Sequence, residues 1–397
     1  MKTSILRANP AYIFLALHLS AVFLLTAYPF TYEKAITRGF SDVIDYIAVA
    51  NAPDLASIHQ FSLSHAMHRL ERWPLHFLMG RLSSLSLINV WDLERLFVLL
   101  GMGTTLVLIG SLRAGLWQKL AIYSLLIFSP YAFRQYYAVP GMLSDCFFYV
   151  AIVGVAVGMW EKRWALIVIS VCIGCFMRQT GVLLLPLIVI FCFVEKINLR
   201  KGIAVVALGL MSFGLSKFLS YIVFTPVSGG YVAMHTLGIF FWLAQNPQWL
   251  DLIDFLGRYG LMLMTLSPML LLINHLNYRD WMYVAFFFFL HTQPLLAGPA
   301  VSGSNVDRLA IYGLPFIGLL LIEGSNQRTW VGLFICLVFL ESLLPNFSIL
   351  HAIGYPRYFF VSTVIMIFFA SIIINKYKRS SDNLMVESKI NQTGDRL

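Results

Sequence analysis

Three acidic residues lie close together in a chain that has few acids. Asp42, Asp45 and Asp54 all fall in the segment RGFSDVIDYIAVANAPD, residues 38–54. Neighbouring carboxylates can deprotonate a hydroxyl group or bind a divalent cation. Asp54 follows Pro53, a pairing that is typical of turns. Asp42 and Asp45 are therefore the candidates for catalysis, and they are also the candidate ligands if the chemistry uses Mg²⁺ or Mn²⁺.

Arginine residues in polar turns supply the complementary chemistry. A guanidinium group binds phosphate bidentately and keeps its charge at every working pH. A carboxylate that activates a hydroxyl, together with cations that hold a leaving phosphate, suits group transfer from a lipid phosphate. The residues of this candidate substrate-binding set are Tyr46, Arg72, Arg134, Gln135, Tyr137, Arg178, Gln179 and Arg308.

Structural explanations compete with functional ones at several positions. An arginine at the end of a membrane helix often extends to the lipid headgroups, and Asp307 with Arg308 fits a local ion pair. Asp145 fits a cap at the start of a helix. Cys172 and Cys175 have no second pair of cysteines with which to bind a metal, so their spacing favours packing.

The elements that must position these residues are membrane helices. The chain has 397 residues, of which 59% are hydrophobic and 12% are charged, whereas soluble domains have about 25% charged residues. A soluble fold of this size could not bury so much apolar surface. The sequence therefore predicts an all-α, polytopic transmembrane helical bundle.

Hydrophobic segments for about twelve spans (a range of roughly ten to thirteen) follow one another along residues 1–375, which form a single domain. The predicted spans are residues 11–30, 93–112, 117–133, 142–160, 164–177, 181–194, 202–224, 259–275, 281–297, 309–322, 329–344 and 356–375. The turn at residues 178–180 leaves open whether 164–177 and 181–194 are two short helices or one broken helix.

Two polar regions accompany the spans. Residues 31–92 form the first loop, and the mixed segment from Trp73 to Val90 predicts a helix that lies in the membrane interface. Residues 376–397 form a polar tail.

The distribution of charge predicts how the chain is oriented. The net charge of +9 comes from basic residues that are spread singly rather than gathered in a stripe, which argues against a nucleic-acid partner. With the N-terminus inside the cell, more than half of the Lys and Arg residues fall in predicted cytoplasmic segments, as the positive-inside rule requires. Both termini are therefore expected in the cytoplasm, and the acidic first loop outside it.

Short motifs in the first half of the chain add a family resemblance. Residues 42–50 (DVIDYIAVA) fit the pattern D-x-x-x-Y-x-x-x-A after a first membrane span. Residues 72–74 (RWP) are similar to an Arg-x-Pro motif, and residues 178–180 (RQT) to an Arg-Gln-Thr turn between two membrane helices. In order and topology these motifs resemble those of the polytopic GT-C class glycosyltransferases, which use polyprenyl-phosphate sugars.

The resemblance implies an inverting transfer of a hexose or pentose from a polyprenyl-phosphate-linked donor to a lipid-linked or envelope glycan acceptor. Asp42 matches the catalytic acid of the family, Asp45 is an accessory or alternative acid, and Arg178 would lie near the donor phosphate. Some members use a divalent cation and others do not, so the use of a metal stays open. The implied location is the bacterial inner membrane, in contact with its lipids.

Two other functions remain open on the sequence. Many spans with interior charges also suit a transporter or flippase of lipid-linked glycans, although inverted repeats are not visible. A cell-envelope polysaccharide polymerase or ligase would place its chemistry in a later outer loop. In this chain that loop would be residues 225–257, which contain Tyr231, His235 and Asp251.

Overall fold

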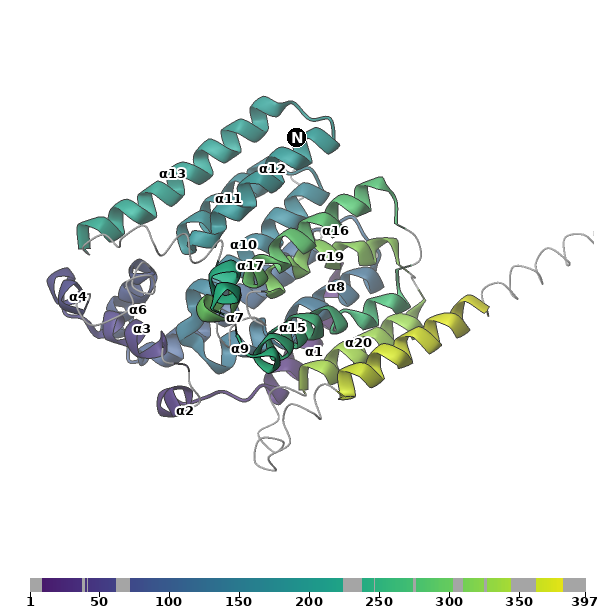
Figure 1. Cartoon of the computed structure of the whole chain (residues 1–397), viewed down its shortest axis with the longest axis horizontal. Coiled ribbons are helices and arrows are strands. Elements are labelled where there is room, and N and C mark those ends of the chain that lie inside the picture. Colours follow the sequence, from purple (N-terminus) through teal and green to yellow (C-terminus); the bar gives the residue numbers. More distant parts are fainter. Residues whose placement is uncertain are drawn as a thin grey trace, which may run out of the picture.

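The computed structural model describes residues 9–37, 40, 42–61, 72–223, 238–245, 247–273, 276–302, 310–324, 327–343 and 362–380. All regular structure in these residues is helical, so the predicted all-α class is confirmed for the described part of the chain. The helices pack side by side around a common apolar core (Figure 1).

The centre of the bundle is α10 (Leu143–Trp160), which is buried along almost its whole length. A helix that is apolar all round must be covered on every face, either by other helices or by lipid. Here α7 (Val90–Gly110) and α11 (Trp164–Met177) pack against it. Gly154 and Gly158 allow the close approach of α11, because a Cβ added at Gly154 would lie 2.2 Å from Ser170 Oγ.

The segment after α11 forms a tight hairpin. The chain leaves α11 at Arg178, whose backbone is extended, and passes through a 3-10 turn, η2 (Gln179–Leu183), into α12 (Leu184–Val194). The Trp164 and Phe191 rings, at opposite ends of the two helices in sequence, have centroids 6.2 Å apart. Of the two alternatives that the sequence leaves open, two helices rather than one broken helix are therefore what forms.

The next helix, α13 (Leu199–Val223), lies along α11 and α12 at one edge of the bundle (Figure 1). On its other side, large apolar side chains such as Met211, Phe218 and Tyr221 are exposed. The far end of α13 extends beyond η2 and contacts α4 (Leu55–Phe61) of the first loop.

The remaining helices complete the bundle on the opposite side. α1 (Pro10–Thr26) and α20 (Arg328–Leu343) pack against α8 (Leu116–Phe128), and α16 (Tyr278–His291) packs against η5 (Ile311–Gly313) and α19 (Leu314–Gly318). The other described helices are α2 (Tyr32–Thr37), α9 (Phe133–Ala138), α15 (Trp249–Met264), α17 (Gln293–Ser302), the 3-10 turns η1 (Pro140–Met142), η3 (Ser267–Leu271) and η6 (Leu319–Glu323), and the helices at residues 238–244 and 362–380.

Three predicted spans differ from the helices that form. The span expected at 259–275 is the end of α15 followed by η3, where Pro268 interrupts the α-helix. The span expected at 281–297 is divided between α16 and α17, and α17 itself kinks at Gly298, which has a φ of 68° and precedes Pro299. The span expected at 309–322 is a succession of η5, α19 and η6. Proline removes a backbone donor and so ends or bends helices at such positions.

The first loop folds as a group of short helices beside the bundle (Figure 1). α6 (Trp73–Leu85) packs against α3 (Asp42–Asn51) and against α7. The contact with α3 is close, since a Cβ added at Gly80 would lie 1.7 Å from the carbonyl oxygen of Ala50. The helix predicted from Trp73 is confirmed and ends at Leu85, five residues before the predicted boundary.

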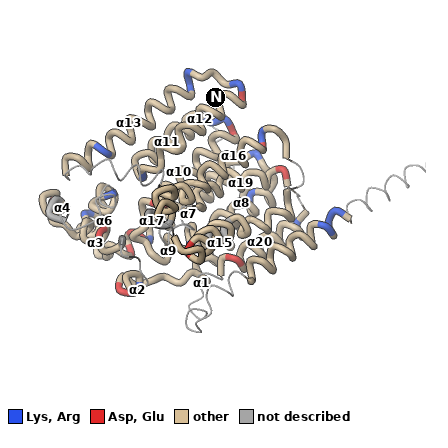
Figure 2. The backbone as a smooth tube through the Cα atoms, in the orientation of Figure 1, with Lys and Arg blue, Asp and Glu red and all other residues tan. Residues whose placement is uncertain are grey.

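Ion pairs gather several turns at one end of the bundle. Glu161, after α10, lies 3.5 Å from Arg113, which precedes α8. Glu195, after α12, lies 2.9 Å from Arg279 of α16 and 2.5 Å from Lys162. Elsewhere most of the tube in Figure 2 is tan, and its charged segments are short and mostly near helix ends. The turns that the sequence predicts as cytoplasmic thus share one end of the bundle.

Three of the described helices are long and apolar enough to cross a bilayer: residues Val90–Gly110, Pro140–Trp160 and Leu199–Val223. Shorter apolar helices occupy Pro10–Thr26, Leu116–Phe128, Trp164–Met177, Gln179–Val194 and Ile311–Glu323. The total of about twelve spans stays a prediction.

Candidate functional site

Asp145, in the first turn of α10, is the centre of a buried cluster of polar side chains. Its side chain is fully buried, and its Oδ1 accepts a hydrogen bond from Nη1 of Arg178. Nη1 of Arg72 lies 3.3 Å from the same oxygen. The N-cap residue of α10 is Met142, and no side chain makes a capping hydrogen bond there. The interpretation of Asp145 as a simple helix cap is therefore wrong. The positive end of the α10 dipole adds to the stabilisation of this carboxylate.

Arg178 enters the cluster from the turn between α11 and η2. Because its backbone is extended, its side chain leaves the helical hairpin and points towards α10. Its Nη1 also donates to the hydroxyl of Tyr312 in η5. The guanidinium carbon lies 5.2 Å from the centre of the Tyr312 ring and 5.9 Å from that of Phe148, distances suited to cation–π attraction.

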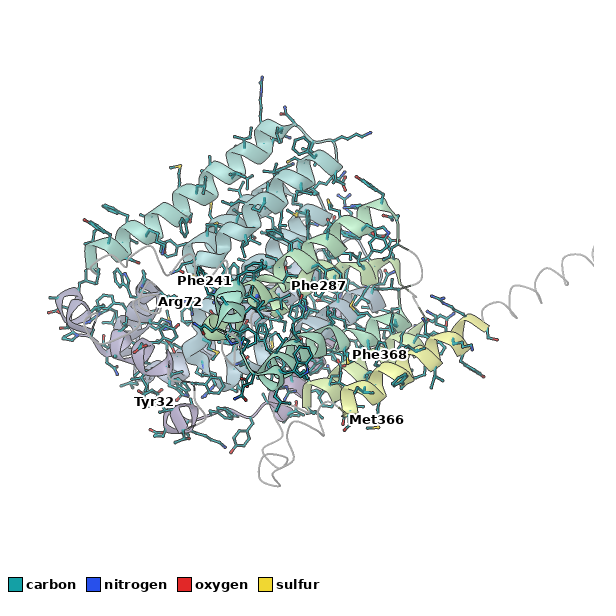
Figure 3. All side chains as sticks on the ribbon, viewed as in Figure 1. Tyr32, Arg72, Phe241, Phe287, Met366 and Phe368 are labelled. Carbon is teal, nitrogen blue, oxygen red and sulfur yellow. The ribbon has the colours of Figure 1, made fainter. Side chains whose placement is uncertain are left out.

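Arg72 and Tyr46 bring the first loop to the same carboxylate. Arg72 is the residue before α6, and its Nη1 donates to the Tyr46 hydroxyl at 2.7 Å. Tyr46 is on α3 and is 2% exposed. Figure 3 labels Arg72 where the loop helices meet the bundle. Three predicted site residues, Tyr46, Arg72 and Arg178, are therefore brought together, although they are far apart in sequence.

The two candidate catalytic acids are on the helix that carries Tyr46. Asp42 is the first residue of α3, one helical turn before Tyr46, and its side chain lies outside the described part of the structure. Asp45 adjoins Tyr46 and is 3% exposed. Arg308 also lies outside the described residues.

Asp54 has the turn role that the sequence predicts. Its Oδ1 accepts from the backbone N and from Oγ of Ser57, both at 2.7 Å, at the start of α4. These hydrogen bonds lower the pKa of the Asp54 carboxyl below its usual range.

Three other predicted residues lie in a different place. Arg134, on α9, is 1% exposed and donates to the carbonyl oxygen of Thr26 at 2.8 Å and to Ser342 Oγ at 3.1 Å. These bonds join α9 to the ends of α1 and α20. The carbonyl oxygen of Tyr137 accepts from Arg95 at 3.2 Å. Gln135 is half-buried between them on α9. Arg134 and Tyr137 are thus part of the packing between helices and make none of the contacts around Asp145.

Gln179 is half-buried on η2, immediately after Arg178. Several hydroxyl groups near Asp145 are buried and make no protein hydrogen bond within the described residues: those of Ser144, Tyr136 and Tyr149. Tyr149 is one turn after Asp145 on α10, and its ring centroid is 6.3 Å from that of Tyr136. Buried hydroxyls of this kind are available to water or to the hydroxyl groups of a ligand.

Sequence reasoning missed two residues of the site, Asp145 and Tyr312. An acid at the start of an apolar helix was the one available signal for Asp145. Tyr312 is in a stretch that predicts only a membrane span, and no local pattern identifies it, because its partner Arg178 comes from a distant segment.

The cluster can bind an anionic group. Two guanidinium groups share one carboxylate, Asp145, so the three side chains together carry a net positive charge. Within the described residues no group of three or more His, Cys, Asp or Glu side chains is arranged to hold a metal ion.

No protein-family model, no characterised protein and no solved structure matches this chain.

Proposed function

We propose that the protein is an integral membrane glycosyltransferase that moves a sugar from a polyprenyl-phosphate donor to a lipid-linked or envelope glycan acceptor. The observation that carries the proposal is the convergence of Arg72 and Arg178 on Asp145, with Tyr46 bonded to Arg72. Each of the three motifs that resemble the GT-C class contributes a residue to this one cluster or to the helix beside it. Motifs that merely matched by chance would have no reason to meet in space.

In the proposed reaction the donor phosphate lies against the guanidinium groups of Arg72 and Arg178. The acceptor hydroxyl loses its proton to a carboxylate of α3, with Asp42 as the base and Asp45 as its alternative. The acceptor oxygen forms a bond to the anomeric carbon as the bond between that carbon and the phosphate oxygen breaks. The leaving polyprenyl phosphate gains negative charge, which the two arginines stabilise. Attack opposite the leaving group inverts the anomeric centre.

The proposed site faces the extracytoplasmic side of the inner membrane. Supporting this orientation, the basic turns around Arg113, Lys162 and Arg279 share one end of the bundle. The cluster around Asp145 lies at the start of α10, whereas Glu161 lies just after the end of that helix. An excess of Lys and Arg marks cytoplasmic turns. Both termini would then be cytoplasmic, and the chain would cross the membrane about twelve times.

The experiment that tests the proposal measures sugar transfer by the purified protein with synthetic polyprenyl-phosphate sugars, read by mass spectrometry. Asp42→Asn is expected to abolish product while the protein still reaches the membrane. Asp54→Asn is the matched control, because it removes a charge from the same loop and retains an oxygen that can cap α4. Full transfer by Asp42→Asn contradicts the catalytic assignment, and transport without transfer in proteoliposomes favours a flippase.

A further inference from the structure

A buried histidine–glutamate pair lies beside the Asp145 cluster and has no part in the proposed reaction. Nδ1 of His76, on α6, lies 2.6 Å from Oε1 of Glu94, on α7. Neither side chain is exposed. Burying a carboxylate or an imidazolium is unfavourable unless the group is paired, so each residue depends on the other.

The imidazole of His76 also supports the ring of Tyr46. The two rings are nearly parallel, with centroids 4.3 Å apart and an interplanar angle of 10°. Stacking of this kind restricts the ring of Tyr46 to one plane, and Glu94 fixes the plane of the imidazole in turn.

Close packing keeps the two stacked rings together. Gly80 is one turn after His76 on the same face of α6, and a Cβ there would lie 1.7 Å from the Ala50 carbonyl oxygen of α3. At this separation α6 has no space to move closer to α3. Apolar side chains of the two helices, such as Trp73 of α6 and Val49 of α3, are buried in one cluster. The imidazole therefore lies against Tyr46 because of how the two helices pack.

The hydroxyl of Tyr46 passes this restraint to the phosphate-binding cluster. It accepts the 2.7 Å hydrogen bond from Nη1 of Arg72, the same nitrogen that lies 3.3 Å from Asp145. The side chain of Arg72 is 16% exposed, against 7% for Arg178. A continuous set of contacts thus runs from Glu94 through His76 and Tyr46 to Arg72.

We propose that His76 and Glu94 form a positioning dyad, which holds Tyr46 and through it keeps Arg72 at Asp145, ready to bind the phosphate of a lipid-linked substrate. The phosphate-binding role of Arg72 rests on the proposed function. The proposed effect of the dyad is on the orientation of one arginine, and the dyad takes no part in the bond changes of the proposed reaction.

The test measures how freely Arg72 moves. The full-length protein in detergent is treated with phenylglyoxal, which modifies arginine side chains, and the modification of Arg72 is quantified by peptide mass spectrometry. In His76→Ala and in Tyr46→Ala, Arg72 is expected to react about tenfold faster than in the wild type, and the double variant no faster than either single variant, because coupled residues act non-additively. Glu94→Leu, which leaves the imidazole in place but unpaired, is expected to act in the same direction.

Tyr123→Phe is the matched control. It also removes a buried hydroxyl with a 2.7 Å hydrogen bond, in this case to Ser20 between α1 and α8, and it is expected to leave the reactivity of Arg72 unchanged. A conservative variant, Glu94→Gln, retains an oxygen that can accept from Nδ1 of His76 and is expected to restore most of the protection. Each variant is first shown to be monodisperse by size-exclusion chromatography.

The outcomes separate the dyad from the proposed function. If Arg72 reacts at the wild-type rate in both His76→Ala and Glu94→Leu, the dyad is overturned, even where the wild type transfers sugar. If the wild type transfers no sugar but the variants release Arg72, the proposed function fails and the positioning of Arg72 by the dyad stands. If the wild type transfers sugar and the variants also release Arg72, the sugar-transfer rates of the single and double variants are expected to show the same non-additivity. Losses of transfer rate that add up in the double variant contradict the dyad.

Discussion

Arg178 and Arg134 show that two buried arginines can serve different purposes in one chain. Arg178 is bonded to a carboxylate, Asp145, and to a phenol, Tyr312. Arg134 is bonded to neutral oxygen atoms of Thr26 and Ser342. An arginine that shares a carboxylate with a second arginine leaves donor groups and net charge for an anion, whereas one bonded to helix ends stabilises packing.

Replacing each arginine by glutamine tests this distinction. In Arg178→Gln the proposed phosphate-binding charge is lost, and kcat/KM for the polyprenyl-phosphate donor is expected to fall by about a hundredfold, the effect of losing roughly one charge-assisted contact in the transition state. In Arg134→Gln the midpoint of thermal unfolding is expected to fall while KM for the donor is unchanged. Equal loss of kcat/KM in both variants, at equal amounts of folded protein, would contradict the assignment.

At the scale of elements, the two arginines of the motifs lie at the ends of helices, and the tyrosine lies within one. Tyr46 is on α3, Arg72 immediately precedes α6, and Arg178 immediately follows α11. The sequence predicts a polar turn at 178–180 but leaves open whether the chain reverses there. The reversal depends on Gly181, because a Cβ at this position would lie 2.3 Å from the carbonyl oxygen of Gly174. This close contact sets where Arg178 points.

Gly181→Ala is therefore expected to damage both the hairpin and the site. The added methyl group must push η2 away from α11, and overpacking of this kind costs about 1–3 kcal/mol. The expected results are a lower midpoint of thermal unfolding in detergent and slower sugar transfer. Gly103→Ala on α7 is the control, because no atom lies within 4 Å of an added Cβ there, and it should not lower the unfolding midpoint. A Gly181→Ala protein as stable and active as the control would refute the role of this contact.

At the scale of the whole molecule, the bundle separates its polar chemistry into two ends. Ion pairs around Glu161 and Glu195 join the turns at one end, and the Asp145 cluster lies at the opposite end of α10. Exposed apolar side chains along α13 suit contact with lipid between these ends. The proposed orientation puts the first-loop helices outside the cytoplasm.

Cysteine labelling in intact cells tests this orientation. In a cysteine-free background, Leu87→Cys, in the fully exposed turn between α6 and α7, is expected to react with a membrane-impermeant maleimide. Arg200→Cys, exposed at the start of α13, is expected to react only after the membrane is permeabilised. The reverse pattern of labelling would invert the topology and exclude an extracytoplasmic site.

The sequence by itself determined the helical class, the apolar character of the helices and several of the polar residues that meet. Composition and hydrophobic periodicity are properties of neighbouring residues, so they are legible without a structure. The turn role of Asp54 follows from the same local rules.

Only the tertiary structure decided which polar residues share a site. It joined Arg72 and Arg178 at Asp145, moved Arg134 to the junction of α1, α9 and α20, and added Tyr312 and the His76–Glu94 pair. It also divided the expected spans at 259–275, 281–297 and 309–322 into shorter helices. Contacts between segments far apart in the chain depend on how whole helices pack, and hydrophobic periodicity carries no information about which helices become neighbours.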